Sequence, residues 1–418
     1  MNLTAPPLEP SAERRVVLLV TLVQLVNVLD FVMVMPLGRD FALALGFPEA
    51  RLGLVGGSYT LAAAVAGLVG SRFLDRADRR TALTIAMLGL VAATAAGGFA
   101  RDLPTMMASR IVAGAFGGPA TALSLAIVAD VVPPERRGKA MSVVMAAFSI
   151  ASVLGIPAGL YAAQLGSWRT PFFAVAALGL LVTLYTARSL PSLRGHLAGL
   201  RGPVTPTLAL LRRPEIRAIL TAAGSMTFSV FLVVPYIRSF LEANHHYPSD
   251  RIMYLYLVGG ACSFAVVRVA GPLVDRFGST PIASLGTTLV CLCLAIGFLP
   301  ETPIAPVMLV FSVFMCTSSL RGVPISTLAS KLPAPHERAQ YMSLQSAVQH
   351  LASSTGAIFA SQILVTGADQ RLHHIEVVVA VAIVIALAMP VLLWRVERRV
   401  RARDAAQRAV PLVEAPAA

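Results

Sequence analysis

Charged residues are scarce in this chain of 418 residues, where they make up 13% of the sequence, against about 25% in a typical soluble protein. Hydrophobic residues make up 56%, and the mean hydropathy is +0.74. A water-soluble protein of this length needs far more polar surface. The composition therefore excludes two or three soluble domains and favours a chain that crosses a lipid bilayer many times.

Lysine is almost absent, occurring only as Lys139 and Lys331, so arginine supplies nearly all of the basic residues behind the net charge of +13. An excess of basic residues can indicate a nucleic-acid partner. Here, however, the arginines lie in short loops between apolar runs. That placement indicates membrane topology, and no nucleic-acid partner is predicted.

Cysteine is also rare, and all four cysteines lie within apolar runs: Cys262, Cys291, Cys293 and Cys316. This position favours small lipid-buried residues over a disulfide or a metal site. No glycine-rich loop ending in Lys-Ser or Lys-Thr occurs, so ATP-driven transport is not indicated. The chain contains no catalytic constellation, and the sequence predicts neither an enzyme nor a bound cofactor.

What the chain does contain is a series of long apolar segments. A helix of about 20 residues crosses the hydrocarbon core, and twelve segments fit: 16–38, 52–71, 81–100, 104–130, 140–162, 168–190, 214–240, 252–273, 280–299, 304–328, 340–366 and 375–394. The longest interruption, 191–213, predicts a linker between two halves, 1–190 and 214–394. The basic and then Ala/Pro-rich segment 395–418 predicts a tail that is mostly disordered apart from its helical start.

The basic residues also predict the orientation of the chain. With both termini inside, cytoplasmic segments hold 24 Lys and Arg, outer segments hold seven, and three lie within the spans. This asymmetry follows the positive-inside rule. An Arg- and Ala-rich composition indicates a bacterium with GC-rich coding. We therefore expect a multi-pass protein of the bacterial cytoplasmic membrane, acting as a monomer, with both termini in the cytoplasm.

An internal repeat divides the chain. Three residues recur 199 positions later, Pro36, Arg39 and Phe41 as Pro235, Arg238 and Phe240. Two further pairs recur downstream, Asp75-Arg76 as Asp275-Arg276 and Met141-Ser142 as Met342-Ser343. The chain therefore contains a repeated unit of roughly 200 residues. In so apolar a sequence, such a repeat predicts a membrane transporter with two halves.

The loop Gly70–Arg80 reads GSRFLDRADRR. It resembles the signature loop of the major facilitator superfamily, except that Ser71 and Asp78 stand where glycines are usual. The second copy, Gly271–Gly278, keeps both glycines. The resemblance covers roughly 14–394 and implies an all-α membrane protein with twelve transmembrane helices in two pseudo-symmetric six-helix bundles.

Two further motifs resemble one branch of that superfamily. The fourth helix carries Arg110–Gly114, and the fifth carries Gly155, Pro157 and Gly159 followed by Gly166–Arg169. These are similar to motifs of the twelve-helix drug:proton antiporters and of the sugar (arabinose) efflux permeases. The resemblance implies that the two halves meet and rock at the fifth helix, and that a proton enters as a small organic molecule leaves.

Asp30 and Arg110 are charged residues inside apolar segments, and their predicted depths in the bilayer coincide. A carboxylate at that depth must be paired, hydrated or protonated. Burial raises its proton affinity and a neighbouring arginine lowers it, so a balanced group can load and release a proton. The alternative is a fixed structural ion pair. Ser229 takes the place of Asp30 in the second repeat, so duplication does not explain the carboxylate.

Other polar and aromatic side chains in apolar segments are candidates for binding substrate. They are Gln24, Asn27, Phe228, Arg321, Gln345, Gln349 and His350. Gln24 and Asn27 share a helix face with Asp30. Hydrogen bonding between helices is the alternative for the amides, and plain packing for Phe228 and His350. Arg321 either meets an anionic or polar substrate group or bonds to carbonyls of a neighbouring helix.

A third set of residues is predicted to control the conformation. Asp75, Arg76, Arg79 and Arg80 are expected to form a cytoplasmic latch, with Arg76 or Arg79 paired to Asp130, or else to be solvated topology charges. Gly155, Pro157 and Gly159 let the fifth helix bend and a neighbour approach.

The leading hypothesis is proton-coupled export of a drug, sugar or metabolite across the lipid bilayer. Uptake of a small metabolite by symport stays open. A copper transporter is a further alternative, since imidazole and thioether ligands suit copper and the chain offers His245-His246, His373-His374, Met33, Met35, Met141 and Met145. A lipid scramblase or membrane sensor would be a class without transport.

Overall fold

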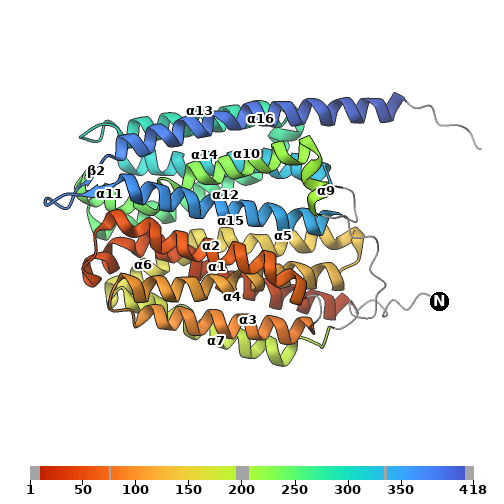
Figure 1. Ribbon diagram of the computed structural model, residues 1–418, viewed down its shortest axis with the longest axis horizontal. Helices are drawn as coiled ribbons and strands as arrows, with labels where there is room; N and C mark the ends of the chain where they lie inside the picture. Colours follow the sequence, from red (N-terminus) through yellow and green to blue (C-terminus); the bar gives the residue numbers. More distant parts are fainter. Residues whose placement is uncertain (1–9, 75–76, 194–206, 334–336, 410–418) are drawn as a thin grey trace, which may run out of the picture.

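The computed structural model describes residues 10–74, 77–193, 207–333 and 337–409, and these form an almost entirely helical bundle (Figure 1). The long helices are α1 Pro10–Leu45, α2 Leu52–Leu74, α3 Arg79–Gly98, α4 Leu103–Val131, α5 Pro134–Ile150, α6 Ile156–Leu165, α7 Arg169–Ser189, α10 Pro214–Phe231, α12 Ile252–Phe277, α13 Ser279–Phe298, α14 Val307–Lys331, α15 Arg338–Ile363 and α16 Ile375–Ala409. Short elements are η1 Glu49–Arg51, η2 Ala151–Gly155, α9 Thr207–Arg212, η3 Val234–Tyr236, α11 Ile237–Ala243, η4 Ser249–Arg251 and the hairpin β1 Val365–Thr366 with β2 Leu372–His373.

Each of the twelve predicted spans coincides with a helix or with a helix that is interrupted once. Eleven of the described helices are long and apolar enough to cross a membrane. The remaining predicted span, 340–366, falls on α15, which carries glutamines, a histidine and several serines along its length. The predicted fold class, two pseudo-symmetric six-helix bundles, is confirmed.

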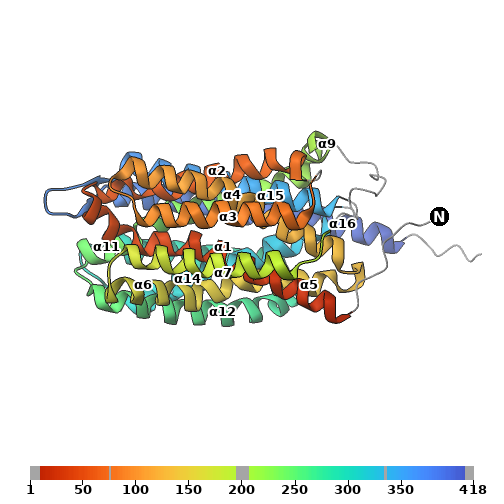
Figure 2. The same cartoon turned by 90° about the horizontal axis from the view of Figure 1, so that it is seen from below.

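The helices lie in two groups that are parallel to the long axis of the molecule. The group from red to yellow (α1–α7) lies beside the group from green to blue (α10–α16), and the view turned by 90° shows the same alignment along the axis (Figures 1 and 2). Each group has its own apolar core, around Leu83 and Leu90 in the first and Ile216 and Leu393 in the second. Most of the predicted linker, 194–206, lies outside the described residues.

The fifth span is interrupted where the sequence predicted a bend. Between α5 and α6, η2 is a π-helical turn that ends at Gly155, and Pro157 follows in the first turn of α6. Proline has no N–H and its ring displaces the carbonyl four residues earlier, which widens the turn. Leu29 of α1 packs so tightly here that a Cβ on Gly155 would lie 2.0 Å from Leu29 Cδ2.

The two repeated prolines act differently. Pro36 lies inside the continuous helix α1, whereas Pro235 lies in η3, where the seventh span breaks between α10 and α11. The break at Pro235 turns the short α11 toward α1, and it supplies one side of the ionic cluster described below.

The helical start expected for the tail extends over 395–409, because α16 continues to Ala409. Val396 and Val400, one turn apart, are buried in the core of the second half. Between them, Glu397 accepts hydrogen bonds from the backbone N–H groups of Ser279 and Thr280, at 3.0 and 2.8 Å. This carboxylate caps the start of α13 and holds the extension in place.

The closest contacts between the two halves lie near one end of the bundle. We call the contact end the outer end, following the predicted topology. Near it, a Cβ on Gly53 of α2 would lie 2.0 Å from the carbonyl oxygen of Ala357 of α15, and a Cβ on Gly260 of α12 would lie 3.1 Å from Val153 Cα. Toward the inner ends of the same helices, a Cβ on Gly67 or Gly271 would meet nothing within 4 Å. The close contacts between the halves therefore hold the outer end closed.

Candidate functional site

Asp30 of α1 and Arg110 of α4 form an ion pair inside the first half. Arg110 Nη1 lies 2.9 Å from Asp30 Oδ1, and both residues are 0% exposed. Thr94 Oγ1 of α3 donates to the same oxygen at 2.6 Å. Among the described residues, Asp30 Oδ2 and Arg110 Nε and Nη2 have no hydrogen-bond partner. The pair is thus neutral overall, but only partly satisfied.

The surroundings of this pair are apolar and close-packed. Arg110 Cζ lies 5.3 Å from the centre of the Phe172 ring of α7, a cation–π distance. Gly97 of α3 makes room for both, because a Cβ there would lie 3.1 Å from Arg110 Nη2 and 2.9 Å from Phe172. In such a site water cannot replace a lost partner, so each charge depends on the other.

The second half carries a different arrangement. Ser229, the counterpart of Asp30, is buried and its hydroxyl donates only to Met226 O of its own helix, at 2.8 Å. Arg321 of α14 is 1% exposed, and Nε and Nη2 have no partner among the described residues. Its side chain packs against α13, where a Cβ on Gly286 would lie 3.0 Å from Arg321 Cγ. No described carboxylate pairs with this arginine.

Of the predicted substrate residues on α1, Asn27 is engaged within the protein. Its Nδ2 donates to Gly117 O at 2.9 Å and to Thr121 Oγ1 at 2.6 Å, while Tyr59 Oη donates to its Oδ1 at 3.1 Å. This is the interhelical bonding that the sequence left as the alternative. Gln24 is buried, and its Oε1 has no partner among the described residues.

The predicted residues on α15 are less enclosed. Gln345, Gln349 and His350 are half-buried, and the described part of the chain gives none of them a hydrogen-bond partner. Phe228 of α10 lies 6.2 Å from Phe359 of α15, ring centre to ring centre. Polar groups that are left open in this way suit a surface that faces a water-filled cavity.

Aromatic rings connect the two halves beside Asp30, and the sequence did not identify this contact. Phe31 stacks on Tyr59 with ring centres 5.3 Å apart, and on Phe231 of the second half with centres 6.1 Å apart. Phe31 directly follows Asp30 in α1. A change at the carboxylate is thus one residue away from a contact between the halves.

At the inner end, Arg79 Nε lies 3.1 Å from Asp130 Oδ2, one of the two pairings expected for the latch. Arg80 is half-buried, while Asp75 and Arg76 lie outside the described residues. Asp78, which replaces the usual glycine, caps α3 by accepting from Arg80 N at 3.0 Å. The departure from the family pattern therefore has a local structural role.

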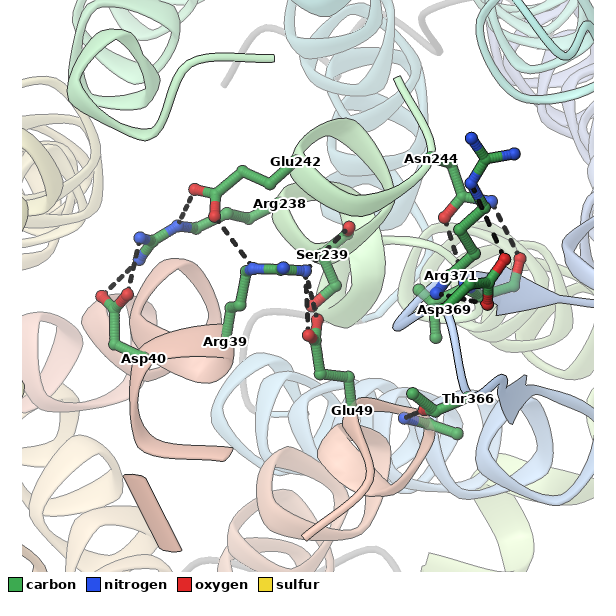
Figure 3. Close-up of polar contacts among 12 residues, drawn as sticks. Arg39, Asp40, Glu49, Arg238, Ser239, Glu242, Asn244, Thr366, Asp369 and Arg371 are labelled. Carbon is green, nitrogen blue, oxygen red and sulfur yellow. Dashed lines mark hydrogen bonds and ion pairs between the residues drawn. The ribbon is translucent and has the colours of Figure 1, made fainter. Parts of the chain in front are cut away.

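At the outer end, five charged side chains form one cluster, which we call the outer ionic cluster: Arg39, Asp40, Glu49, Arg238 and Glu242 (Figure 3). Arg39 Nη1 lies 2.8 Å from Glu49 Oε1, and Arg39 Nε lies 3.0 Å from Glu242 Oε2. Arg238 pairs with both oxygens of Asp40, at 2.6 and 2.8 Å, and its Nε lies 2.7 Å from Glu242 Oε1. Each arginine thus reaches a carboxylate of the other half.

Neutral hydrogen bonds close the same end. Tyr236 Oη accepts from Gly53 N at 3.1 Å and lies 3.2 and 3.3 Å from the carbonyl oxygens of Ala50 and Ala357. Ala50 N donates to Thr366 Oγ1 of β1 at 3.0 Å (Figure 3). Elements from both halves therefore share backbone and side-chain bonds at this end.

The sequence reading counted Arg39 and Arg238 only as loop charges. Their side chains are 15% and 7% exposed and do not behave as solvated topology charges. The available signal was the repeat itself, which places these arginines 199 positions apart, at equivalent places in the first and seventh spans. Composition alone does not show that an arginine at a helix end is buried.

The histidine pairs proposed as copper ligands make other contacts. His245 Nε2 lies 3.2 Å from Pro300 O, and His246 Nε2 lies 3.2 Å from Arg371 Nη2. His373 Nε2 lies 3.4 Å from Asp369 Oδ1. Within the described ranges, no three His, Cys, Asp or Glu side chains gather as a metal ion would require.

Two relatives align with part of the chain. This chain is 26% identical over 273 residues to a chloramphenicol resistance protein of Streptomyces lividans, and the alignment covers 65% of this chain and 70% of that protein. It is 28% identical over 255 residues to the purine ribonucleoside efflux pump NepI of Escherichia coli O157:H7. That alignment covers 60% of this chain and 62% of the pump, less than two thirds of its length.

Solved structures share the fold at low identity. A bacterial homologue of the human lysosomal transporter Spinster, in an inward-facing and unoccupied conformation, superposes with a TM-score of 0.70 at 15% identity, covering 97% of this chain and 100% of that one. A D-xylose–proton symporter superposes with a TM-score of 0.69 at 18% identity, covering 89% and 96%. The sequence profile of the Major Facilitator Superfamily matches residues 20–357 and 268–417. The chain therefore belongs to the Major Facilitator Superfamily of membrane transporters.

Proposed function

We propose that this transporter exports a small organic molecule by exchanging it for protons, with Asp30 as the group that carries the proton. The observation behind the proposal is the buried pair of Asp30 and Arg110, which has one unpartnered carboxylate oxygen. The second half has serine at the equivalent position. A buried ionisable pair in only one half suits a coupling site better than a scaffold element that both halves need.

The chemistry follows from the neutrality of the pair. A proton on Asp30 leaves Arg110 without a counter-charge in a site that excludes water, so the protonated site favours any conformation that hydrates or re-pairs the arginine. Loss of the proton restores the 2.9 Å contact. Phe31, which follows Asp30, stacks on Phe231 of the other half. A shift of α1 would therefore change this contact between the halves.

The substrate is proposed to bind in the inner opening between the halves. Gln345, Gln349 and His350 supply unoccupied polar groups there, Phe228 supplies an aromatic surface, and Arg321 supplies a cation without a partner. The two named relatives, a chloramphenicol resistance protein and a purine ribonucleoside efflux pump, suggest a neutral or weakly polar ring-bearing molecule of similar size.

The proposal is tested in sealed proteoliposomes with an imposed pH gradient, using chloramphenicol, purine ribonucleosides, dyes and sugars as candidate cargo. Asp30→Asn should abolish gradient-driven transport, while the protein still inserts and binds the ligand. Asp369→Asn is the matched control, because this carboxylate lies in an exposed loop and should transport normally. Full gradient-dependent transport by Asp30→Asn would show that Asp30 does not carry the coupling proton.

A further inference from the structure

The outer ionic cluster has an unequal number of charges. It contains two arginines, Arg39 and Arg238, and three carboxylates, Asp40, Glu49 and Glu242. If every group is ionised, the cluster carries one uncompensated negative charge. A surplus charge is inexpensive in water and costly in a buried site. The burial of each carboxylate therefore decides which of the three is the most costly to keep ionised.

The surplus lies on the buried side of the cluster. The Asp40 side chain is 34% exposed and binds Arg238 through both oxygens, so water and a bidentate partner stabilise its charge. Glu49 and Glu242 are 2% and 6% exposed. Arg39 is the only described cation paired with Glu49, and it also serves Glu242. Glu242 also pairs with Arg238 Nε at 2.7 Å, so among the described residues only Glu49 depends on the Arg39 guanidinium group alone.

Glu49 is the less well satisfied of the two. Arg39 Nη1 donates to Glu49 Oε2 at 3.1 Å, but Oε1, although 2.8 Å from the same nitrogen, has no aligned donor among the described residues. The buried Ser239 hydroxyl of α11 lies beside this carboxylate, where it can donate to the ionised acid, and it has no other partner among the described residues. A proton on Oε1 reverses this arrangement, because Oε1 then donates and Ser239 Oγ accepts.

We propose that the closed outer cluster holds one proton on Glu49, which makes it a second proton-binding site, separate from Asp30. The proton cancels the surplus charge and satisfies Glu49 Oε1. When the outer end opens, water reaches the carboxylate and its proton leaves to the outside. The inference rests on the alternating access proposed above, but not on Asp30 as the coupling group.

The direction of the pH effect follows from this difference in proton binding. The closed outer end binds one proton more than the open outer end, so lowering the outside pH stabilises closure, and raising it favours opening. The other ionisable side chains that face Glu49 are Arg39 from α1 and Glu242 from α11. An acidic exterior would thus return the transporter to the state seen here, in which the outer end is closed.

The experiment follows the separation of the outer ends in lipid nanodiscs. Spin labels are placed at Leu165→Cys and Ile304→Cys, which lie in opposite halves and are each 72% exposed, after replacement of the four native cysteines by serine. Asp30→Asn is present throughout, so that titration of Asp30 cannot contribute. Pulsed electron paramagnetic resonance then gives the fraction of open molecules from pH 5 to 9.

The open fraction should rise with pH in the parent protein. Glu49→Gln should remove this dependence and keep the outer end closed, because the amide mimics the protonated acid. Ser239→Ala should move the transition to higher pH by about 1 unit, since the ionised Glu49 carboxylate loses a hydrogen-bond donor. Glu376→Gln is the matched control, because this glutamate is solvent-exposed at the same end, and the transition should be unchanged.

Two results would overturn the inference. One is a distance distribution in the parent that does not depend on pH, which would mean that the cluster is a fully ionised latch. The other is a Glu49→Gln or Ser239→Ala protein that responds like the parent. Because Asp30 is absent from every sample, neither result bears on the coupling role proposed for that residue.

Discussion

The two halves of the molecule each bury an arginine in a helix of the bundle, but only one of these arginines has a carboxylate. Arg110 in α4 pairs with Asp30 at 2.9 Å, whereas Arg321 in α14 has two nitrogens without partners among the described residues. The contrast teaches that duplication preserved the helical scaffold and not its charges. In the first half, Asp30 neutralises the buried arginine. In the second half, no described carboxylate neutralises Arg321, so its charge needs another partner.

The outer end shows the opposite relation between the halves. Arg39 and Arg238 come from equivalent positions of the repeat, and each pairs with a carboxylate across the boundary. Symmetry is kept where the halves close against each other and lost where a proton or substrate is proposed to bind. This pattern is expected if closure of the outer end needs matching residues from both halves, whereas binding of a proton or of substrate needs residues that only one half supplies.

Breaking the pair in the first half should have the largest effect. Arg110→Gln leaves Asp30 buried without a counter-charge, so we expect a loss of about 3–5 kcal/mol in unfolding free energy and no gradient-driven transport. The double variant Asp30→Asn, Arg110→Gln should recover most of the stability and none of the transport. Thermal unfolding and proteoliposome flux measure the two effects. Equal destabilisation by the single and double variants would mean that the ion pair is not the source of the loss.

Replacing Arg321 of the second half should change transport without lowering the stability of the fold. Arg321→Met replaces an unpaired buried cation by an apolar chain of similar length, so unfolding stability should be unchanged or higher. If Arg321 contacts the substrate, transport should fall about tenfold, which corresponds to about 1.4 kcal/mol. Flux and thermal unfolding of the same preparation provide the test. A large drop in melting temperature would instead assign Arg321 a structural role.

The smallest expected effect concerns the outer turn of the second half, where His245 stands at the position of Gly46 in the first. Burial lowers the pKa of His245 below its usual value, partly opposed by its hydrogen bond to Pro300 O. A lowered pKa means that the unfolded chain binds more protons, so this group destabilises the fold as pH falls below about 6.5.

His245→Gln should therefore flatten the pH dependence of the melting temperature slightly between about pH 6.5 and 5. The exposed His374→Gln at the same end is the matched control and should leave the profile unchanged. An identical profile for His245→Gln and the parent would show that burial of this imidazole has no measurable cost.

Several elements could be predicted because a few charges in apolar segments carry a strong signal. Asp30 and Arg110 were recognised as partners from depth alone, and Pro157 beside Gly155 indicated the interruption of the fifth span. Asn27 was harder, since an amide inside a helix can face a cavity or a neighbouring helix with the same sequence pattern. Only the positions of Gly117 and Thr121 on α4 show that Asn27 is engaged within the protein.

The outer ionic cluster and the length of the helical tail could not be predicted for a common reason. Arg238 is placed by the break at Pro235, and Glu397 by contacts with Ser279 and Thr280 of α13, far away in sequence. Whether a charged side chain near a helix end is solvated or paired depends on which elements pack beside it. In the sequence, a solvated charge in a loop cannot be distinguished from a charge in an ion pair until the neighbouring elements are known.

The amino-acid sequence by itself determined the bilayer-spanning helices, the division into two repeated halves and the family, because hydrophobic length and repeated motifs are local properties of the chain. Tertiary structure alone decided which charges meet at the outer end, which arginine stays without a partner among the described residues and which end of the bundle is closed. The physical reason is that the energy of a buried charge depends on the atoms within a few ångströms of it, and residues from distant parts of the chain supply those atoms.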